Sequence, residues 1–158
     1  MNKWYLITCK FTKEFTDGTL KRVSQKYIVN AYSFTDAEAK ITAEVGAHIR
    51  GAFEIKKIQQ KRYEDLYLTE SQPFGTYYEC KVDAVISDAD TGKDKKSTFK
   101  FIVEADNLGA AFEFMRQDLD ERGVKATISA VVDAEIEEVF ISNGFQTSVT
   151  DKEAAESV

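Results

Sequence analysis

The chain has 158 residues, of which 43% are hydrophobic and 30% charged, and its formal net charge is −6. This is ordinary globular composition, which excludes an intrinsically disordered chain. No apolar run approaches the roughly 20 residues that cross a bilayer, and the N-terminus enters a strand pattern without a signal-peptide core, so we expect a cytoplasmic protein with no membrane partner.

The first element that the sequence predicts is a β-hairpin with its turn at Asp17-Gly18. Glycine is typical of such a turn because it adopts positive φ at no steric cost. Apolar side chains alternate along the two flanking segments, which is the period of a half-buried strand. These side chains are Tyr5, Ile7, Cys9, Phe11, Tyr27, Val29 and Ala31. We expect them to form the core face of the hairpin.

A helix is predicted after the hairpin. Thr35 and Glu38 have the spacing of a capping box, and Gly51 stands where a left-handed C-terminal residue is expected. Between these signals lies an apolar stripe with a period of four, formed by Ala37, Ile41, Val45 and Ile49. This face should pack against the hairpin.

A long third strand is predicted from Phe53 to about Leu68. Its alternation slips around residues 56–58, which indicates a β-bulge. The segment 69–75 follows and holds the only proline of the chain. We interpret it as a connector that is too short to let the flanking segments move far apart.

The second half of the sequence repeats the first. With a shift of 74 residues, the turn glycine, the second strand and the helix fall on chemically similar residues. At the N-terminal arm the shift is 73, so the second hairpin, with Thr91-Gly92 at its turn, carries one extra residue. A second helix is predicted from a cap at Asn107 to a stop at Gly123, and a cleanly alternating third strand from Ala126 to about Ile141. Four similar elements in the same order indicate an internal duplication.

These patterns predict an α+β fold, a tandem duplication of a ββαβ unit with mainly antiparallel sheet, one helix per unit and a pseudo-twofold. The expected domains are a first unit at 1–68, the connector at 69–75, a second unit at 76–141 and a disordered polar tail at 142–158. Charge is divided unequally, because residues 1–68 hold 12 Lys and Arg against 8 Asp and Glu, whereas residues 69–158 hold 9 against 19. Such asymmetry is typical either of an electropositive binding face or of two halves that attract each other.

Residues 21–41 read KRVSQKYIVNAYSFTDAEAKI. This stretch resembles the characteristic segment of an uncharacterised family of small two-repeat proteins, found in gut Bacteroidota and in their phages and mobile elements and catalogued as a domain of unknown function. The similarity extends to about Ile141 and covers roughly nine tenths of the chain. The resemblance implies a setting in a bacterial host cell. It implies no catalytic residue, because that family has no assigned activity.

The residues supply little catalytic chemistry. The only histidine, His48, lies at the edge of the first helical stripe and has no evident counterpart in the second copy. Carboxylates stand at matching places in both copies, at Glu64, Asp65, Glu135, Glu137 and Glu138. Such carboxylates are usually solvated, and no His or Cys accompanies them as a metal ligand. We therefore expect a protein that is not an enzyme, with no catalytic residue, no metal and no cofactor.

Two further motifs are expected to be structural. Cys9 and Cys80 fall in apolar strand patterns without metal-ligand or disulfide spacing, so we expect buried, unreactive thiols. The segment 88–92 begins like a calcium loop, but its twelfth position is Phe99 in place of a glutamate, so a hairpin turn is favoured.

The sequence contains one candidate surface for nucleic acid. Trp4 and Tyr77 occupy matching positions opposite the core face, and Lys26 shares that face. Single-stranded nucleic-acid binders combine aromatic rings, on which bases stack, with cations for the backbone. The predicted third strand adds a basic run formed by Lys56, Lys57, Lys61 and Arg62. The alternative is that this second face is buried as well, because apolar residues on both faces of a strand usually mean that both are covered.

Three hypotheses follow. The first is a non-catalytic binding or assembly protein of a phage or mobile element, acting through a sheet surface or strand edges on a protein partner or on itself. The second is a single-stranded nucleic-acid binding accessory protein that uses Trp4, Tyr77, Lys26, Lys56, Lys57, Lys61 and Arg62. The third and least favoured is an enzyme centred on His48 or on the glutamate clusters.

Overall fold

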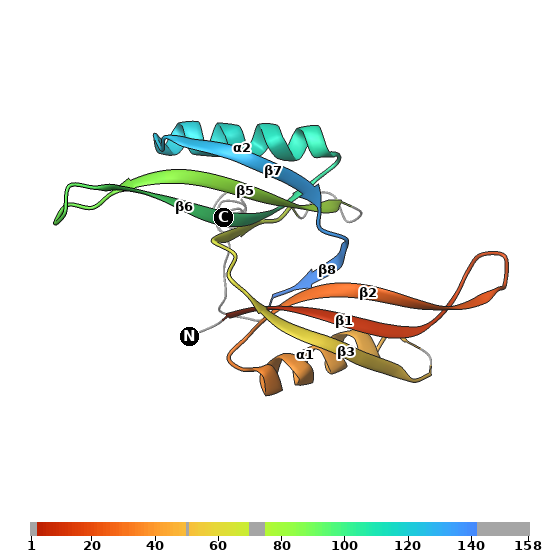
Figure 1. Cartoon of the computed structure of the whole chain (residues 1–158). Helices are drawn as coiled ribbons and strands as arrows, with labels where there is room; N and C mark the ends of the chain where they lie inside the picture. Colours follow the sequence, from red (N-terminus) through yellow and green to blue (C-terminus); the bar gives the residue numbers. More distant parts are fainter. Residues whose placement is uncertain (1–2, 50, 70–74, 142–158) are drawn as a thin grey trace, which may run out of the picture. The chain divides into compact units, whose positions relative to one another are not determined.

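The structure is a computed structural model that describes residues 3–49, 51–69 and 75–141 (Figure 1). Most of the predicted connector and the predicted disordered tail lie outside the described residues. Within these ranges the chain forms two helices and eight strands, arranged in two four-stranded sheets. The fold is therefore α+β with mostly antiparallel strands, as predicted.

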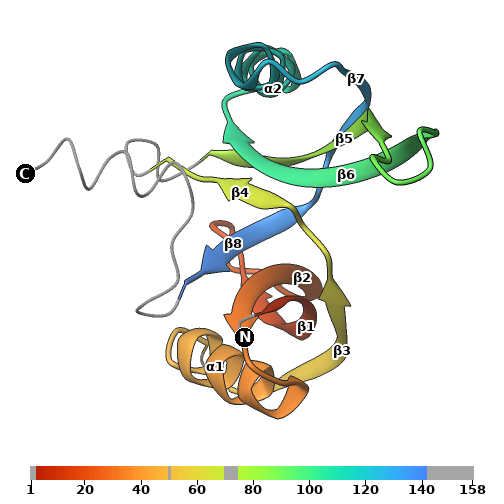
Figure 2. The same cartoon turned by 90° about the vertical axis from the view of Figure 1, so that its left-hand side faces the viewer.

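The chain divides into two compact units. Unit 1 contains the residues up to Arg62 together with the segment that begins at Glu135, and unit 2 is Tyr63–Ala134. Each unit consists of one sheet and one helix, which lies across one face of its own sheet (Figures 1 and 2). The domain boundary therefore falls before the predicted connector, and the last strand belongs to the first unit.

Unit 1 is built on a long hairpin of β1 (Lys3–Glu14) and β2 (Leu20–Ala31). β3 (Phe53–Lys61) pairs antiparallel with β1, and β8 (Ile136–Phe140) pairs parallel with β2, which gives the order β3-β1-β2-β8. Helix α1 (Phe34–Gly46) covers one face. The predicted core faces of the hairpin are confirmed, because the buried cluster beneath this helix contains Tyr5, Ile7, Cys9, Tyr27, Val29, Ala31, Ala37, Ile41 and Val45.

The hairpin of unit 2 consists of β5 (Thr76–Ser87) and β6 (Asp94–Ala105), with β7 (Ala126–Asp133) antiparallel to β5 and β4 (Asp65–Tyr67) parallel to β6. The sheet of unit 2 has the order β4-β6-β5-β7. Helix α2 (Leu108–Arg122) packs on this sheet. The core side chains beneath it are Tyr67, Tyr78, Cys80, Val82, Phe101, Val103, Ala111, Met115 and Leu119.

The two predicted long third strands are wrong, because each consists of two strands that belong to different sheets. The first breaks between Lys61 and Asp65, and its second part, β4, joins the sheet of unit 2. The second breaks at Glu135, which has a φ of 56°, and its second part, β8, joins the sheet of unit 1. The fourth strand of each sheet therefore comes, in the chain, directly after the third strand of the other unit. β4 follows β3 and joins the unit-2 sheet, and β8 follows β7 and joins the unit-1 sheet. Alternation of apolar residues continues through the second break, at Ala134 and Ile136, so periodicity alone does not reveal it. At the first break residues 59–62 are all polar.

Both third strands contain a bulge. In unit 1 the pairing passes from Thr8–Lys57 to Cys9–Ile55, so Lys56 is the extra residue, as the phase slip predicted. In unit 2 Ser129 is the extra residue, so the predicted clean alternation is wrong. As a result Val131 packs against the core, whereas Val132 is 49% exposed.

The helix caps were predicted in part. Asn107 caps α2 by accepting a hydrogen bond from the amide of Ala110 at 2.8 Å, and Gly123 ends this helix with a φ of 67°, both as predicted. Helix α1 begins earlier than expected, because Ser33 and not Thr35 is its N-cap. Gly51 has a φ of 101° but lies in the turn before β3, and the C-cap is Ala47.

In the part of the chain that the structure describes, neither helix has the length and apolar character needed to traverse a lipid bilayer.

Candidate functional site

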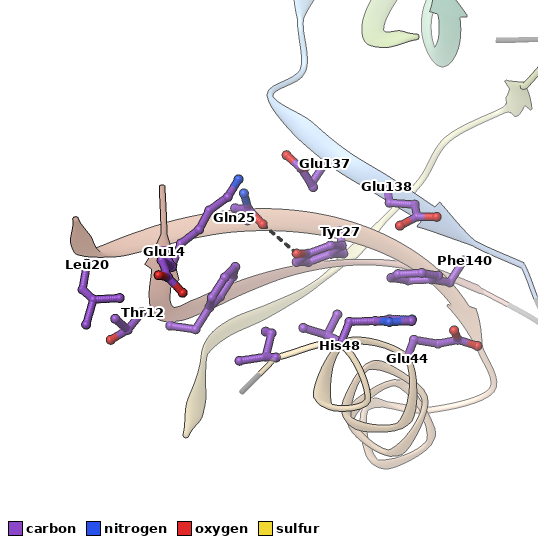
Figure 3. Close-up of a pocket in the computed structure, with 14 residues that line it drawn as sticks. Thr12, Glu14, Leu20, Gln25, Tyr27, Glu44, His48, Glu137, Glu138 and Phe140 are labelled. Atoms are coloured by element: carbon purple, nitrogen blue, oxygen red, sulfur yellow. Dashed lines mark hydrogen bonds between the residues drawn. The ribbon is translucent and has the colours of Figure 1, made fainter. Parts of the chain in front are cut away.

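The best-formed hollow described in unit 1 is an open cavity of about 580 Å³, which we call the unit-1 cavity (Figure 3). It lies between the outer part of the β1–β2 hairpin, the C-terminal end of α1 and strand β8. Its volume is within the range of sites that bind small ligands or single side chains of a partner. The lining residues are Phe11, Thr12, Lys13, Glu14, Leu20, Gln25, Tyr27, Glu44, Val45, His48, Ile49, Glu137, Glu138 and Phe140.

The cavity exists because β8 covers only part of β2. Strand β8 pairs with β2 only from Lys26 to Val29. Leu20 and Gln25 come before these residues, so β8 does not pair with this part of β2, which forms a wall of the cavity. On the other side α1 ends at Gly46, and the chain turns there with the amide of His48 donating to the carbonyl oxygen of Val45 at 3.0 Å. The short strand and the early helix end together leave the hollow.

The floor of the cavity is aromatic. The rings of Tyr27 and Phe140 stack with their centroids 5.7 Å apart and an interplanar angle of 20°. The hydroxyl of Tyr27 donates to Oε1 of Gln25 at 2.8 Å. Burial first, and then the nearby charges of Glu137, Cys9 and Glu138, raise the pKa of Tyr27 to about 12. Tyr27 therefore serves the site as a neutral ring and hydrogen-bond donor at physiological pH.

The rim of the cavity is acidic. Glu14, Glu44, Glu137 and Glu138 line it, and Lys13 is the only lysine or arginine among the described residues of the lining. None of the four glutamates forms an ion pair with any residue in the described ranges. The C-terminal end of α1 adds the negative end of a helix dipole, and its last turn contains no basic residue. The cavity therefore favours a cation.

The structure brings together two candidate sets of residues that lie far apart in the sequence. His48 and the β8 glutamates Glu137 and Glu138 line the same cavity, with Glu138, Phe140, His48 and Glu44 at one end of it (Figure 3). No hydrogen bond or ion pair joins His48 to a carboxylate in the described part of the chain, so nothing there orients the imidazole as a general base. Glu64 and Asp65 belong to unit 2 and Glu135 pairs with Lys26, so these carboxylates are not part of the lining.

The cysteines are buried as predicted. Cys9 and Cys80 are both 0% exposed and lie in the cores of units 1 and 2. Burial raises the pKa of Cys9 to about 11 and that of Cys80 to about 12. A thiol with such a pKa is a poor nucleophile, because the thiolate is the reactive form. Among the described residues no group of three potential metal ligands is found.

The aromatic residues proposed for nucleic acid are not exposed. Trp4 is 8% exposed and Tyr77 is 9% exposed, which leaves little ring surface for a base. Ile28 and Ile102, on the same strand faces, are fully buried. Lys26 lies 3.9 Å from Glu135 in an ion pair.

Three residues of the basic run lie on β3, an edge strand of the unit-1 sheet, and Arg62 follows directly after that strand. Lys56 is the bulged residue and pairs with Glu54 at 3.2 Å. Lys57 and Arg62 are exposed, and neither forms an ion pair with a residue that the structure describes. Charged side chains on an edge strand also prevent unwanted pairing with other sheets, so this run has a structural explanation that needs no ligand.

The sequence did not predict the unit-1 cavity. Tyr27 was placed correctly on the core face, but Glu44 and Phe140 were not singled out, because the cavity forms only when β8 reaches the first sheet. The signal that could have found it is a difference between the halves. With a shift of 74 residues His48 stands against Arg122, and with a shift of 73 residues Tyr67 stands against Phe140.

Comparison with known proteins identifies one family. The family model described as "Domain of unknown function (DUF4494)" matches residues 3–142. No curated protein and no solved structure matches the chain.

Proposed function

The chain belongs to the DUF4494 family, whose function is unknown, and from this premise we propose that it is a non-catalytic binding protein whose site is the unit-1 cavity. It acts on a protein partner or on a second copy of itself. The observation that carries this proposal is the combination of an open hollow with an aromatic floor and four glutamates that lack ion-pair partners in the described chain.

Unpaired carboxylates around an apolar floor are the features of a site that is completed by a ligand. Apolar lining residues such as Phe11, Val45 and Ile49 supply contact area, and the glutamates select the sign of charge. The site also lies on regular secondary structure, because its walls are three strands of one sheet and the end of a helix. A hollow of this kind binds with less loss of conformational freedom than a loop would.

We infer that the two units arose by tandem duplication and are related by a pseudo-twofold. Support comes from features that the two units share and that are not required by an α+β fold in general. Both sheets have the same order of corresponding strands, and both third strands carry a bulge at matching residues, Lys56 and Ser129. Both helices are capped by a polar side chain at matching residues, Ser33 and Asn107.

The cellular setting of the proposal rests on the family resemblance alone. On that basis we place the protein in the cytoplasm of a bacterial host, as a binding or assembly component of a phage or mobile element. Such a component needs a recognition surface and no catalytic residue, which fits the inventory of the unit-1 cavity.

The proposal is tested by comparing two charge-matched variants as affinity baits in lysate of the native host. Glu138→Arg places a cation on the rim of the cavity, and Glu121→Arg makes the same charge change on the exposed surface of α2. A protein that the parent and Glu121→Arg capture in stoichiometric amount, and that Glu138→Arg loses, is the expected result. The same pair in light scattering tests self-association. Equal behaviour of both variants in both measurements would refute the proposal.

A second candidate function is contact with single-stranded nucleic acid along β3. The observation in its favour is that Lys57 and Arg62 are exposed without an ion-pair partner in the described residues. Trp4 and Tyr77 expose little ring surface for stacking, so this candidate relies on phosphate contacts for its affinity.

A further inference from the structure

In unit 2 an arginine stands at the position that corresponds to His48 of the unit-1 cavity. There the guanidinium of Arg122, at the end of α2, pairs with Asp118, with 3.0 Å between Nε and Oδ2. The same guanidinium donates to the hydroxyl of Tyr67, which in turn donates to Asp118 at 3.0 Å. The ring of Tyr67 stacks on Phe101 with centroids 5.9 Å apart. An arginine thus occupies the junction between helix end, carboxylate and stacked rings.

Unit 1 contains a similar junction without the arginine and without the tyrosine hydroxyl, because Phe140 stands where unit 2 has Tyr67. Phe140 of β8 stacks on Tyr27 of β2, as Tyr67 of β4 stacks on Phe101 of β6. The carboxylate is retained, because Glu44 stands at the same distance from the cap of α1 as Asp118 does from the cap of α2. The position of Arg122 is taken by His48, which is shorter and pairs with no carboxylate in the described residues.

The charge around this junction also differs between the two units, and the difference favours binding of an arginine from outside by unit 1. In unit 2 the positive charge of Arg122 stands in the last turn of α2 and balances Asp118 and the helix dipole. In unit 1 the last turn of α1 has no basic residue, and Glu44 is joined on the rim by Glu14, Glu137 and Glu138. The local charge therefore remains uncompensated within the described chain.

Arginine fits this site better than lysine does. Its planar guanidinium stacks on an aromatic face and forms a fork that matches a carboxylate, whereas an ammonium is a compact, strongly hydrated point charge. The unit-1 cavity offers both an aromatic face and a carboxylate at the end where Phe140, His48 and Glu44 lie together (Figure 3). Its volume of about 580 Å³ leaves room for the residues on either side of the arginine against Phe11 and Ile49.

We propose that the unit-1 cavity binds an arginine side chain of a partner protein, whose guanidinium pairs with Glu44 beside the stacked rings of Phe140 and Tyr27. The inference rests on the proposed binding function and adds the chemistry of the partner. The arginine supplied from outside to unit 1 corresponds to the arginine that unit 2 supplies from its own helix.

The test is an NMR titration of the full chain with two blocked tripeptides, acetyl-Gly-Arg-Gly-amide and acetyl-Gly-Lys-Gly-amide. The arginine peptide should shift the resonances of Tyr27, His48 and Phe140 and bind about tenfold more tightly than the lysine peptide. Glu44→Gln should weaken binding of the arginine peptide about tenfold, because the charge-assisted pair is lost. Glu121→Gln, which removes the same charge from the surface of α2, should leave it unchanged.

A second variant places the guanidinium in the cavity from within. His48→Arg should abolish binding of the arginine peptide and raise the midpoint of thermal unfolding, and the added change Glu44→Gln should cancel that increase. Equal affinity for the two tripeptides, or unchanged peptide binding by His48→Arg, would overturn the arginine assignment while the binding function stands. If neither peptide shifts the cavity resonances and Glu138→Arg also loses no partner, both the assignment and the proposed function fail.

Discussion

The ring of Phe140 lies 5.7 Å from that of Tyr27, centroid to centroid, although the two residues belong to strands at opposite ends of the described chain. The contact depends on the parallel pairing of β8 with β2, which aligns Phe140 with Val29. Phe140 also packs against the buried cluster of unit 1. It therefore links the candidate site to the stability of the sheet.

Replacement of Phe140 by alanine should destabilise the protein by about 2 kcal/mol. A fully buried phenylalanine costs about 3–5 kcal/mol when it is truncated, and Phe140 is only partly buried. Urea unfolding followed by circular dichroism measures the loss. The control is Glu137→Ala on the same strand, an exposed position where a change within about 0.5 kcal/mol is expected. Equal stability of the two variants would mean that the stacked pair contributes nothing.

Tyr27 should make the folded protein sensitive to alkaline pH. Because its pKa is raised from 10.0 to about 12 in the folded state, the folded state retains a proton that the unfolded chain releases. Stability is therefore fully present below pH 10 and falls as the pH rises toward 12. The Tyr27→Phe variant should lose less stability than the parent between these pH values, by about 2–3 kcal/mol. Parallel stability curves for the two proteins would contradict the shift.

The cap of α2 should contribute about 1 kcal/mol. Oδ1 of Asn107 accepts a hydrogen bond from the amide of Ala110, so Asn107→Ala leaves a helix donor without its partner. Asn107→Asp retains the acceptor and should restore stability to within a few tenths of a kcal/mol. Thermal unfolding of the three proteins distinguishes these outcomes. A loss in the aspartate variant as large as in the alanine variant would assign another role to this position.

Division of the chain between the two units should prevent either part from folding fully alone. A fragment of residues 1–69 lacks β8, and a fragment of residues 75–158 lacks β4, so each sheet is short of one strand. Mixing the fragments should restore the circular dichroism spectrum and a cooperative thermal transition. A fragment 1–69 that unfolds cooperatively as a monomer at the parent's midpoint would show that β8 is dispensable. The readout must include light scattering, because an isolated β4 can also pair with a second copy.

The nucleic-acid candidate predicts a clear effect of the β3 cations. The double variant Lys57→Glu/Arg62→Glu should abolish any binding of fluorescently labelled oligothymidine at low salt, measured by anisotropy. The matched control Lys93→Glu/Lys95→Glu reverses two exposed charges of unit 2 and should leave binding intact. Binding should also weaken with added salt, because phosphate contacts release counterions. No binding by the parent protein, or equal binding by both variants, removes this candidate.

The elements with local sequence signals were predictable. The hairpin turns were located by glycines that have φ values of 83° at Gly18 and 68° at Gly92, and the end of α2 by Gly123. The start of α1 was misplaced by two residues because Ser33 and Thr35 are both good N-cap residues. In the structure the amide of Asp36 donates to Oγ of Ser33 at 3.1 Å, and Oδ2 of Asp36 accepts from the amide of Tyr32 at 3.0 Å. Asp36 thus stands where a glutamate was expected, but it accepts from the residue before the N-cap and not from the N-cap itself.

The features that depend on distant pairing were not predictable from one sequence. Ile136 continues the alternation of the predicted third strand, and nothing local shows that Leu66 and Ile136 are each buried in another sheet than the strand before them. The bulge at Ser129 was missed because Ala130 is small enough to fit either face of a strand. The unit-1 cavity was missed for the same reason as the strand exchange, since its acidic wall is β8. The half of the chain that appeared basic thereby receives three glutamates, Glu135, Glu137 and Glu138.

The strand exchange also determines when the protein can fold during its synthesis. The hairpin of β1 and β2 is among the first parts to leave the ribosome, yet its sheet has to wait for β8, the last described strand. Closing so long a loop is slow compared with hairpin formation. Until then the edge of β2 between Lys26 and Val29 is available to other chains, so the nascent protein passes through a stage in which a chaperone or a neighbouring nascent copy has access to it.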